Sequence, residues 1–279
     1  MQPLSEIAYA KINLALHVRG RRADGYHDLE TIFAFVDQGD LLTALPSASL
    51  SLNISGPFGD GLSVTDNLVL DAAELLKAHC GIVEGAELSL QKMLPVASGI
   101  GGGSADAAAA LRLLNRLWEC GLDLRDLAVL SASLGADVPA CVYSGTMIGT
   151  GTGTDLKRID DQLLTGMPIL LANPLEAVST AEVFGGWSGD DDGPLGEETT
   201  LDAAKAGKNG LEQSAIALCP EIQEVLAGLK MDQKPLLARM SGSGATCFAL
   251  YENTHERDAA HKALQQIRPQ WWYMAAQMR

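Results

Sequence analysis

The chain has few basic residues for its length. Twenty Lys and Arg side chains stand against 35 Asp and Glu side chains among 279 residues, so the formal net charge is −15. Proteins whose main task is to bind nucleic acid draw much of their affinity from Lys and Arg that neutralise phosphates. The composition therefore argues against a nucleic-acid partner, and any anion that binds must be held by a local arrangement of residues.

Paired cysteines and metal-ligand motifs are also missing. The five cysteines lie far apart, their number is odd, and no CxxC pair occurs. We therefore expect reduced thiols in a cytosolic protein. The five histidines show no HExxH or comparable spacing, which argues against a structural zinc site.

Long apolar runs are missing as well. Glu6 and Lys11 interrupt the first 18 residues, so no signal peptide is predicted. The longest uncharged stretch, 138–154, is rich in Gly, Ser and Thr and contains Pro139, a composition that does not fit a membrane span. With 47% hydrophobic and 20% charged residues, the chain is expected to be globular and cytoplasmic, without a membrane partner.

Strict two-residue alternation marks the start of the chain. Residues 8–18 alternate between apolar side chains and the set Tyr9, Lys11, Asn13, Ala15 and His17, which predicts a half-buried strand. Turn residues follow at 19–28, a second strand is predicted at 29–37, and two short strands are predicted between residues 41 and 54. The first two strands should form an antiparallel pair.

Helical and strand patterns alternate along the rest of the chain. A helix with an Asp or Asn cap is expected at 66–80 and a strand at 85–94. Further helices are expected at 104–120, 124–134, 220–230 and 255–266, and further strands at 168–172 and 247–251. The glycine-rich segment 145–155 predicts a boundary between domains 1–154 and 155–279. The acidic, glycine-rich segment 185–198 is expected to be a mobile surface loop that does not pack.

The most unusual segment is LPVASGIGGGSADAAAAL, Leu94 to Leu111. A strand, a glycine-rich turn and a helix in this order place free backbone N–H groups at the positive end of a helix, which suits a phosphate. The spacing is neither that of a P-loop nor that of a dinucleotide fingerprint. A turn packed too tightly for side chains is the alternative, and the spacing alone leaves both interpretations open.

Three other features are candidates for chemistry. Lys11 and Asn13 share a face of the predicted strand, about 7 Å apart, and offer a charge and an amide to one ligand unless that face is solvated. Asp137 in LGADVPAC begins a predicted helix, where it is either a cap or a base. In MSGSGATCFALY, residues 240–251, Gly242 and Gly244 either let the backbone reach a ligand or form a hairpin.

Taken in order, these segments resemble the motifs of the GHMP kinases, the family named for galacto-, homoserine, mevalonate and phosphomevalonate kinases. AYAKINLAL resembles the first motif, PVASGIGGGSADAAAAL the phosphate-binding second, and MSGSGATCF the C-terminal glycine motif. The resemblance implies an α+β, two-domain GHMP kinase fold. Its N-terminal domain is expected to be like domain 2 of ribosomal protein S5, and its C-terminal domain to be ferredoxin-like.

One branch of the family is similar over a longer stretch, AKINLALHVRGRRADGYHDLETIFAFVD. That similarity implies ATP-dependent phosphorylation of the 2-hydroxyl of diphosphocytidyl-methylerythritol in non-mevalonate isoprenoid biosynthesis, with ATP and Mg²⁺ as cofactors. It makes Lys11 and Asp137 the catalytic residues. Asp137 would accept the hydroxyl proton, while Lys11 would keep Asp137 ionised and attract phosphate charge. A monomer and a homodimer are both compatible with the sequence.

The same resemblance implies the binding residues. Ser104 is expected near Mg²⁺, and no acidic residue is identified as a second magnesium ligand. Asn67, Leu68 and Lys92 are expected at the adenosine. Asn13, Tyr26, His27 and Gly242 are expected at the substrate, with Tyr26 stacked on the cytosine and His27 at its polar edge. The residues expected around the ATP phosphates are Pro95, Val96, Ala97, Ser98, Gly99, Ile100, Gly101, Gly102, Gly103, Ser104 and Ala105.

Three other functions are compatible with some of these sequence features. Homoserine or mevalonate kinase activity would not need the DGYH segment, because those substrates carry no base. A nucleotide sensor without catalysis would be expected to lose Lys11 or Asp137, and both are present. An RNA-binding module on an S5-like domain is disfavoured by the net charge.

Overall fold

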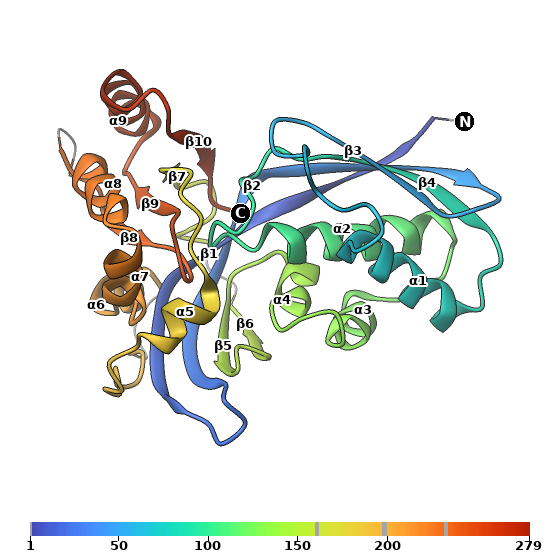
Figure 1. Ribbon diagram of the computed structural model, residues 1–279, viewed down its shortest axis with the longest axis horizontal. Coiled ribbons are helices and arrows are strands. Elements are labelled where there is room, and N and C mark those ends of the chain that lie inside the picture. The colour runs from blue at the N-terminus through green and yellow to red at the C-terminus, as the bar shows by residue number, and fades with distance from the viewer. Residues whose placement is uncertain (1, 160–161, 197–199, 232–233) are drawn as a thin grey trace. The chain divides into compact units, whose positions relative to one another are not determined.

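The computed structural model describes residues 2–159, 162–196, 200–231 and 234–279 (Figure 1). They form two compact units. Unit 1 contains the residues up to Ala10, Gln38–Val96 and Gly101–Ser144, and unit 2 contains Lys11–Asp37, Ala97–Ile100 and Gly145–Arg279. Two long strands, β1 (Leu4–Arg21) and β2 (His27–Ser47), contribute residues to both. The predicted division at residue 154 stays a prediction.

Unit 1 combines a sheet with four helices. The second half of β2 pairs antiparallel with β4 (Gly85–Gln91), and β4 pairs parallel with β3 (Ser51–Ser55). In Figure 1 the helices lie together on one side of β3 and β4. They are α1 (Leu68–Cys80), α2 (Gly102–Leu117), α3 (Leu124–Ser131) and α4 (Val138–Tyr143).

The packing of α1 against α2 follows from small side chains and well-defined helix ends. The Asn67 side chain accepts a hydrogen bond from the amide of Val69 and caps α1, and Gly81 with φ 68° ends it. Ala105 and the run Ala107–Ala110 of α2 are buried, so the backbones of the two helices can approach closely. The helix predicted at 104–120 thus begins two residues earlier and ends three residues earlier than the pattern indicated.

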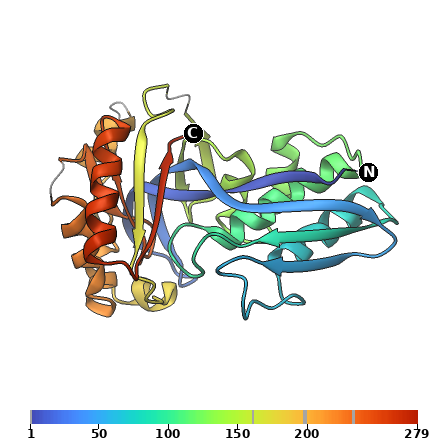
Figure 2. The same cartoon turned by 90° about the horizontal axis from the view of Figure 1, so that it is seen from above.

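Unit 2 contains a four-stranded antiparallel sheet in the order β10-β7-β9-β8. Helices α8 (Glu221–Leu229) and α9 (Thr254–Ile267), orange to red in Figure 2, cover one face of it. This order is that of a split βαβ, or ferredoxin-like, fold, as predicted. Its strands are β7 (Pro168–Asn173), β8 (Leu237–Met240), β9 (Cys247–Leu250) and β10 (Trp272–Gln277).

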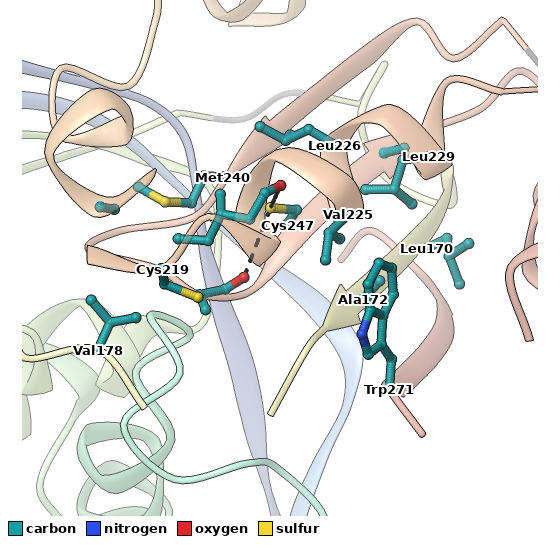
Figure 3. Close-up of a cluster of buried hydrophobic side chains, with 14 of the residues drawn as sticks. Leu170, Ala172, Val178, Cys219, Val225, Leu226, Leu229, Met240, Cys247 and Trp271 are labelled. Carbon is teal, nitrogen blue, oxygen red and sulfur yellow. Dashed lines mark hydrogen bonds between the residues drawn. The ribbon is translucent and has the colours of Figure 1, made fainter. Parts of the chain in front are cut away.

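Unit 2 also contains a hairpin and three further helices among the described residues. Residues 29–33 of β2 pair with β5, and β5 pairs with β6, so the glycine-rich segment 145–155 forms much of a hairpin. A cluster of buried apolar side chains, including Leu170, Val225 and Cys247, forms the core (Figure 3). None of the helices in the described ranges combines the length and apolarity needed to cross a membrane. The remaining elements are β5 (Met147–Gly151), β6 (Asp155–Arg158), α5 (Thr180–Gly185), α6 (Thr200–Ala206) and α7 (Glu212–Leu218).

The prediction of a half-buried first strand is wrong. From Ala10 to Val18 every residue of β1 is buried, Lys11, Asn13 and His17 included. The alternation of polar and apolar residues suggested that the polar face of the strand is solvated. In the structure these polar side chains are instead buried together with polar partners. The break expected after residue 37 is also absent, since β2 runs without interruption to Ser47.

Part of the acidic segment 185–198 packs, contrary to prediction. The carboxylate of Asp192 accepts a hydrogen bond from the amide of Val18 at 2.8 Å and pairs with Lys208 at 2.6 Å. The carbonyl of Gly193 lies 2.9 Å from Nδ1 of His17, and Leu195 is buried. Residues 197 and 198 of this segment lie outside the described ranges. The buried carboxylate of Asp192 thus accepts a hydrogen bond from β1 and holds in place a segment that, from its composition, was expected not to pack.

This anchoring predicts a stability difference between two acidic residues of the same segment. Asp192→Ala should lower the free energy of unfolding by about 1–3 kcal/mol, because the amide of Val18 loses its acceptor. Asp190→Ala is the matched control, since Asp190 is exposed, and should change stability by no more than about 0.5 kcal/mol. Urea denaturation of the two variants measures this. Equal effects would mean that the segment does not pack through Asp192.

Candidate functional site

The glycine-rich loop is held by hydrogen bonds to three successive carbonyl groups. The amide of Lys11 donates to the carbonyl of Ile100 at 3.0 Å, and the hydroxyl of Ser241 donates to that of Gly99 at 2.9 Å. The amide of Thr246 donates to the carbonyl of Ser98 at 3.1 Å. Two motifs that are 140 residues apart in the sequence therefore lie side by side within unit 2, and β1 fixes the same loop.

Steric crowding explains one glycine of this loop but not all of them. Gly99 has φ 76°, and a Cβ atom there would lie 2.5 Å from the carbonyl oxygen of Ser241. Tight packing, the alternative left open by the sequence, is thus the reason for glycine at this position. Gly103 is exposed and helical, and a Cβ atom there would meet only Leu68 Cδ1, at an ordinary 3.7 Å. Packing among the described residues gives no reason for glycine at 103.

The start of α2 offers backbone donors. Gly101, with φ 65°, is the N-cap, and no side chain in the described part of the chain caps this helix. The first intrahelical bond runs from the amide of Ala105 to the carbonyl of Gly101, so the amides of Gly102, Gly103 and Ser104 precede it. Three such N–H groups at the positive end of a 16-residue helix suit an anion.

Lys11 and Asn13 form a buried polar pair in unit 2. Nζ of Lys11 lies 3.3 Å from Oδ1 of Asn13 and 4.6 Å from the centre of the Phe33 ring. Nδ2 of Asn13 donates to the hydroxyl of Thr31 at 2.8 Å, and its backbone amide donates to the hydroxyl of Ser241. Lys11 is 4% and Asn13 is 2% exposed, so the solvated face considered from the sequence is ruled out. An ammonium held beside an amide and an aromatic ring is placed to attract an anion.

Asp137 occupies the N-cap position of α4 in unit 1. Its backbone is in the right-handed helical region rather than extended, and among the described residues its side chain makes no capping hydrogen bond to this helix. Pro139 lies in the first turn, as predicted. The capping interpretation therefore does not account for the carboxylate, which is half-buried.

His27 lies in an aromatic environment that the sequence did not indicate. Its ring is 5.0 Å from that of Phe184 and 5.5 Å, edge-on, from that of Trp187. Nε2 is buried and has no hydrogen-bond partner among the described residues. Burial lowers the pKa of His27, with a smaller contribution from the charge of Arg21, so the ring is neutral at pH 7. Tyr26 beside it is 66% exposed. The sequence carried little signal for these two rings, because Trp187 lies in the segment 185–198 that was expected not to pack and Phe184 lies just before it.

Lys92 has two acidic partners in unit 1. Its ammonium bonds to Asp106 at 2.6 Å and also to Asp40. Asp40 was not recognised from the sequence, because a single acidic residue between two predicted strands carries no distinguishing signal. Asn67 and Leu68 lie at the start of α1, where Asn67 is the cap.

Gly242 completes the contact with the glycine-rich loop. It has φ 55°, and a Cβ atom there would lie 2.8 Å from the carbonyl oxygen of Gly99. No group of three or more His, Cys, Asp or Glu side chains that could hold a metal ion occurs in the ranges that the structure covers. The positions of the predicted residues are thus known, and their roles stay predictions.

Comparison with known proteins identifies the family. Residues 67–145 match the family model for the GHMP kinases N terminal domain, and residues 191–269 match that for the GHMP kinases C terminal. A 4-diphosphocytidyl-2-C-methyl-D-erythritol kinase from Rhizorhabdus wittichii is 51% identical over 99% of this chain and 94% of its own. The protein of the same name from Sphingopyxis alaskensis is 49% identical over 99% of both chains.

A solved structure agrees with these relatives. The crystal structure of a 4-(cytidine 5'-diphospho)-2C-methyl-D-erythritol kinase superposes with a TM-score of 0.82, at 33% identity over 99% of both chains. The two-domain α+β fold expected from the motifs is thereby confirmed. The chain belongs to the GHMP kinase family, and within it to the group of the 4-diphosphocytidyl-2-C-methyl-D-erythritol kinases.

Proposed function

We propose that the chain transfers the γ-phosphoryl group of ATP to the 2-hydroxyl of 4-diphosphocytidyl-2-C-methyl-D-erythritol. Membership of an ATP-dependent kinase family makes ATP the phosphoryl donor. Small molecules are then its partners, and we place its reaction in the cytoplasm, in the non-mevalonate route to isoprenoids. The observation that carries the choice of substrate is the buried Nε2 of His27, which lies in aromatic surroundings and has no hydrogen-bond partner among the described residues.

A nucleobase fits the surroundings of His27 better than homoserine or mevalonate does. An unpartnered buried ring nitrogen is costly, so a ligand that hydrogen-bonds to it gains affinity. The polar edge of cytosine offers both donors and acceptors to a neutral imidazole. The exposed ring of Tyr26 and the ring of Phe184 provide flat surfaces for a base. Homoserine and mevalonate carry no base and would leave these groups unused.

The phosphoryl transfer itself requires positioning and charge stabilisation more than covalent chemistry. The free amides at the start of α2 would hold the phosphates of ATP, with Gly103 allowing their close approach. Asp137 would accept the proton of the 2-hydroxyl as this oxygen attacks the γ-phosphorus. Lys11 would stabilise the negative charge on the transferred group, and Asn13 would orient the alcohol.

Magnesium fits this scheme. Mg²⁺ keeps several water ligands and binds through phosphate oxygens with one or two protein oxygens, so it does not require the acidic cluster that the described residues lack. The hydroxyl of Ser104, in the first turn of α2, would be one such ligand. When bound, the ion would neutralise charge on the β- and γ-phosphates.

Substrate comparison tests the proposal directly. ADP release should be detected with the cytidyl substrate and be absent with homoserine and mevalonate. Asp137→Asn should reduce kcat by about 10²–10⁴-fold, the usual contribution of a general base, while the Kd for ATP stays unchanged. Turnover of homoserine or mevalonate instead would overturn the choice of substrate. Undiminished kcat in the Asp137 variant would overturn the proposed base.

Tyr26→Ala tests the cytosine site without disturbing the core, because Tyr26 is exposed. The KM for the cytidyl substrate should rise by an amount equivalent to ~1–3 kcal/mol of base stacking, while the KM for ATP stays unchanged. Steady-state kinetics with each substrate varied in turn measures both. A parallel rise in the two KM values would show that Tyr26 does not contact the base.

A pair of glycine variants separates packing from phosphate binding. Gly103→Ala should keep or raise stability, by up to about 1 kcal/mol for alanine in a helix. It should also weaken ATP binding roughly tenfold, as expected for one lost hydrogen bond to a charged group. Gly99→Ala should lower the thermal midpoint, because its Cβ atom has no room. Calorimetric binding and thermal denaturation give the two quantities, and unchanged ATP affinity in Gly103→Ala would argue against phosphate at this helix end.

A further inference from the structure

Two hydroxyl groups hold Asn13 in the interior of unit 2. The side-chain nitrogen Nδ2 of Asn13 donates to the hydroxyl of Thr31 at 2.8 Å, and its backbone amide donates to the hydroxyl of Ser241 at 3.2 Å. Asn13, Thr31 and Ser241 are each 2% exposed or less. Hydrogen bonds in such an interior are stronger than in water, so the two hydroxyl groups determine how Asn13 is placed.

The proton of each hydroxyl group is already used elsewhere. Thr31 donates to the carbonyl of Ala15 at 2.6 Å, and Ser241 donates to the carbonyl of Gly99 at 2.9 Å. A hydroxyl group has one proton and two lone pairs, so toward Asn13 both hydroxyl groups act only as acceptors. The nitrogen of the side-chain amide, and not its oxygen, must therefore face Thr31.

This arrangement gives the amide of Asn13 a single orientation. Its oxygen, Oδ1, accepts from Nζ of Lys11 at 3.3 Å, and an ammonium group can only donate. The terminal torsion of an Asn side chain has broad minima, so contacts must fix the plane of the amide. The bond to Thr31 is the shorter of the two, at 2.8 Å, and so it is the stronger contact.

The same arrangement decides what Asn13 offers to a ligand. Nδ2 carries two hydrogen atoms, and among the described residues it makes one hydrogen bond, to Thr31. The second N–H is left for an acceptor, such as the oxygen atom of an alcohol. A donor that binds this oxygen leaves the proton of the alcohol for a base.

We propose that Thr31 is a positioning residue for the phosphoryl transfer, because its hydroxyl orients the amide of Asn13 with Oδ1 toward Lys11 and an N–H toward the alcohol of the substrate. The proposal rests on the function proposed above. Without the hydroxyl of Thr31, the amide of Asn13 loses its shorter hydrogen bond and is free to turn. A reactant that is misplaced by about 1 Å can react 10²-fold more slowly.

Steady-state kinetics of two Thr31 variants tests the proposal. Thr31→Val keeps the shape of the side chain and removes the hydroxyl, so kcat should fall by about 10²-fold while the KM for ATP stays unchanged. Thr31→Ser keeps the hydroxyl and should retain most of the wild-type kcat. Equal losses of kcat in the two variants would overturn the proposal, and so would an unchanged kcat in Thr31→Val.

Thr43→Val is the matched control. Thr43 belongs to the same strand, β2, and is half-buried. Its side chain makes no hydrogen bond to any other residue that the structure describes. This variant should keep the wild-type kcat, which shows that loss of a threonine hydroxyl from β2 is not harmful in itself. A loss of kcat equal to that of Thr31→Val would overturn the proposal.

A measurement on the ligand-free protein separates this proposal from the proposed function. Nuclear magnetic resonance detects the side-chain amide of Asn13, whose signal is identified by its loss in Asn13→Asp. Its protons should exchange slowly with water in the wild type and in Thr31→Ser, and several-fold faster in Thr31→Val. Fast exchange in the wild type would overturn the proposal even if Thr31→Val does not fold, and so would equal exchange in the wild type and Thr31→Val.

Turnover by the wild type provides the other half of this separation. Absence of turnover with ATP and the cytidyl substrate would overturn the proposed function and, with it, the role of Thr31 in phosphoryl transfer. The exchange measurement would still report whether Thr31 holds the amide of Asn13.

Discussion

The close approach of two backbones at Gly99 is the constraint on which the candidate site depends. With hydrogen in place of a side chain, residue 99 can lie against the backbone of Ser241–Gly244, and the carbonyl groups of residues 98–100 are then held from β1 and from the C-terminal motif. The loop that leads into α2 is thereby fixed before any ligand arrives. Fixed donors need little reorganisation when charge develops, and this is the condition under which electrostatic stabilisation is most effective.

Buried polar groups supply the second part of the design. Lys11, Asn13 and His27 in unit 2, and Lys92, Asp40 and Asp106 in unit 1, are all less than 10% exposed. Among the described residues, the buried side-chain nitrogen and oxygen atoms that have no hydrogen-bond partner are Nε2 of His27 and Oδ1 of Asp106. Such atoms are costly in a folded protein. We connect the first with recognition of a base.

Much of the fold was predictable because short-range patterns determine it. The Asn67 cap, the limits of β7 and β9 and the helices α8 and α9 follow from periodicity and capping chemistry. The predictions from the sequence were wrong where a segment is packed by residues that are distant in the sequence. β1 is buried on both faces, and Asp192 packs an acidic loop against it. Polarity along the chain cannot reveal that a polar group will find a partner some 170 residues away.

The sequence by itself determined the family and the order of the motifs, because a long run such as AKINLALHVRGRRADGYHD is too specific to arise from composition. It left open whether the glycines of the loop serve packing or a ligand, and whether Lys11 faces solvent. Only the tertiary structure decided that packing requires glycine at position 99 and that Lys11 is buried, since each point depends on the distance between atoms remote in the chain. Gly99 meets Ser241, whereas Gly103 meets almost nothing. Lys11 lies beside Asn13 and Phe33 in the interior, where a charge interacts more strongly with other charges than it does in water.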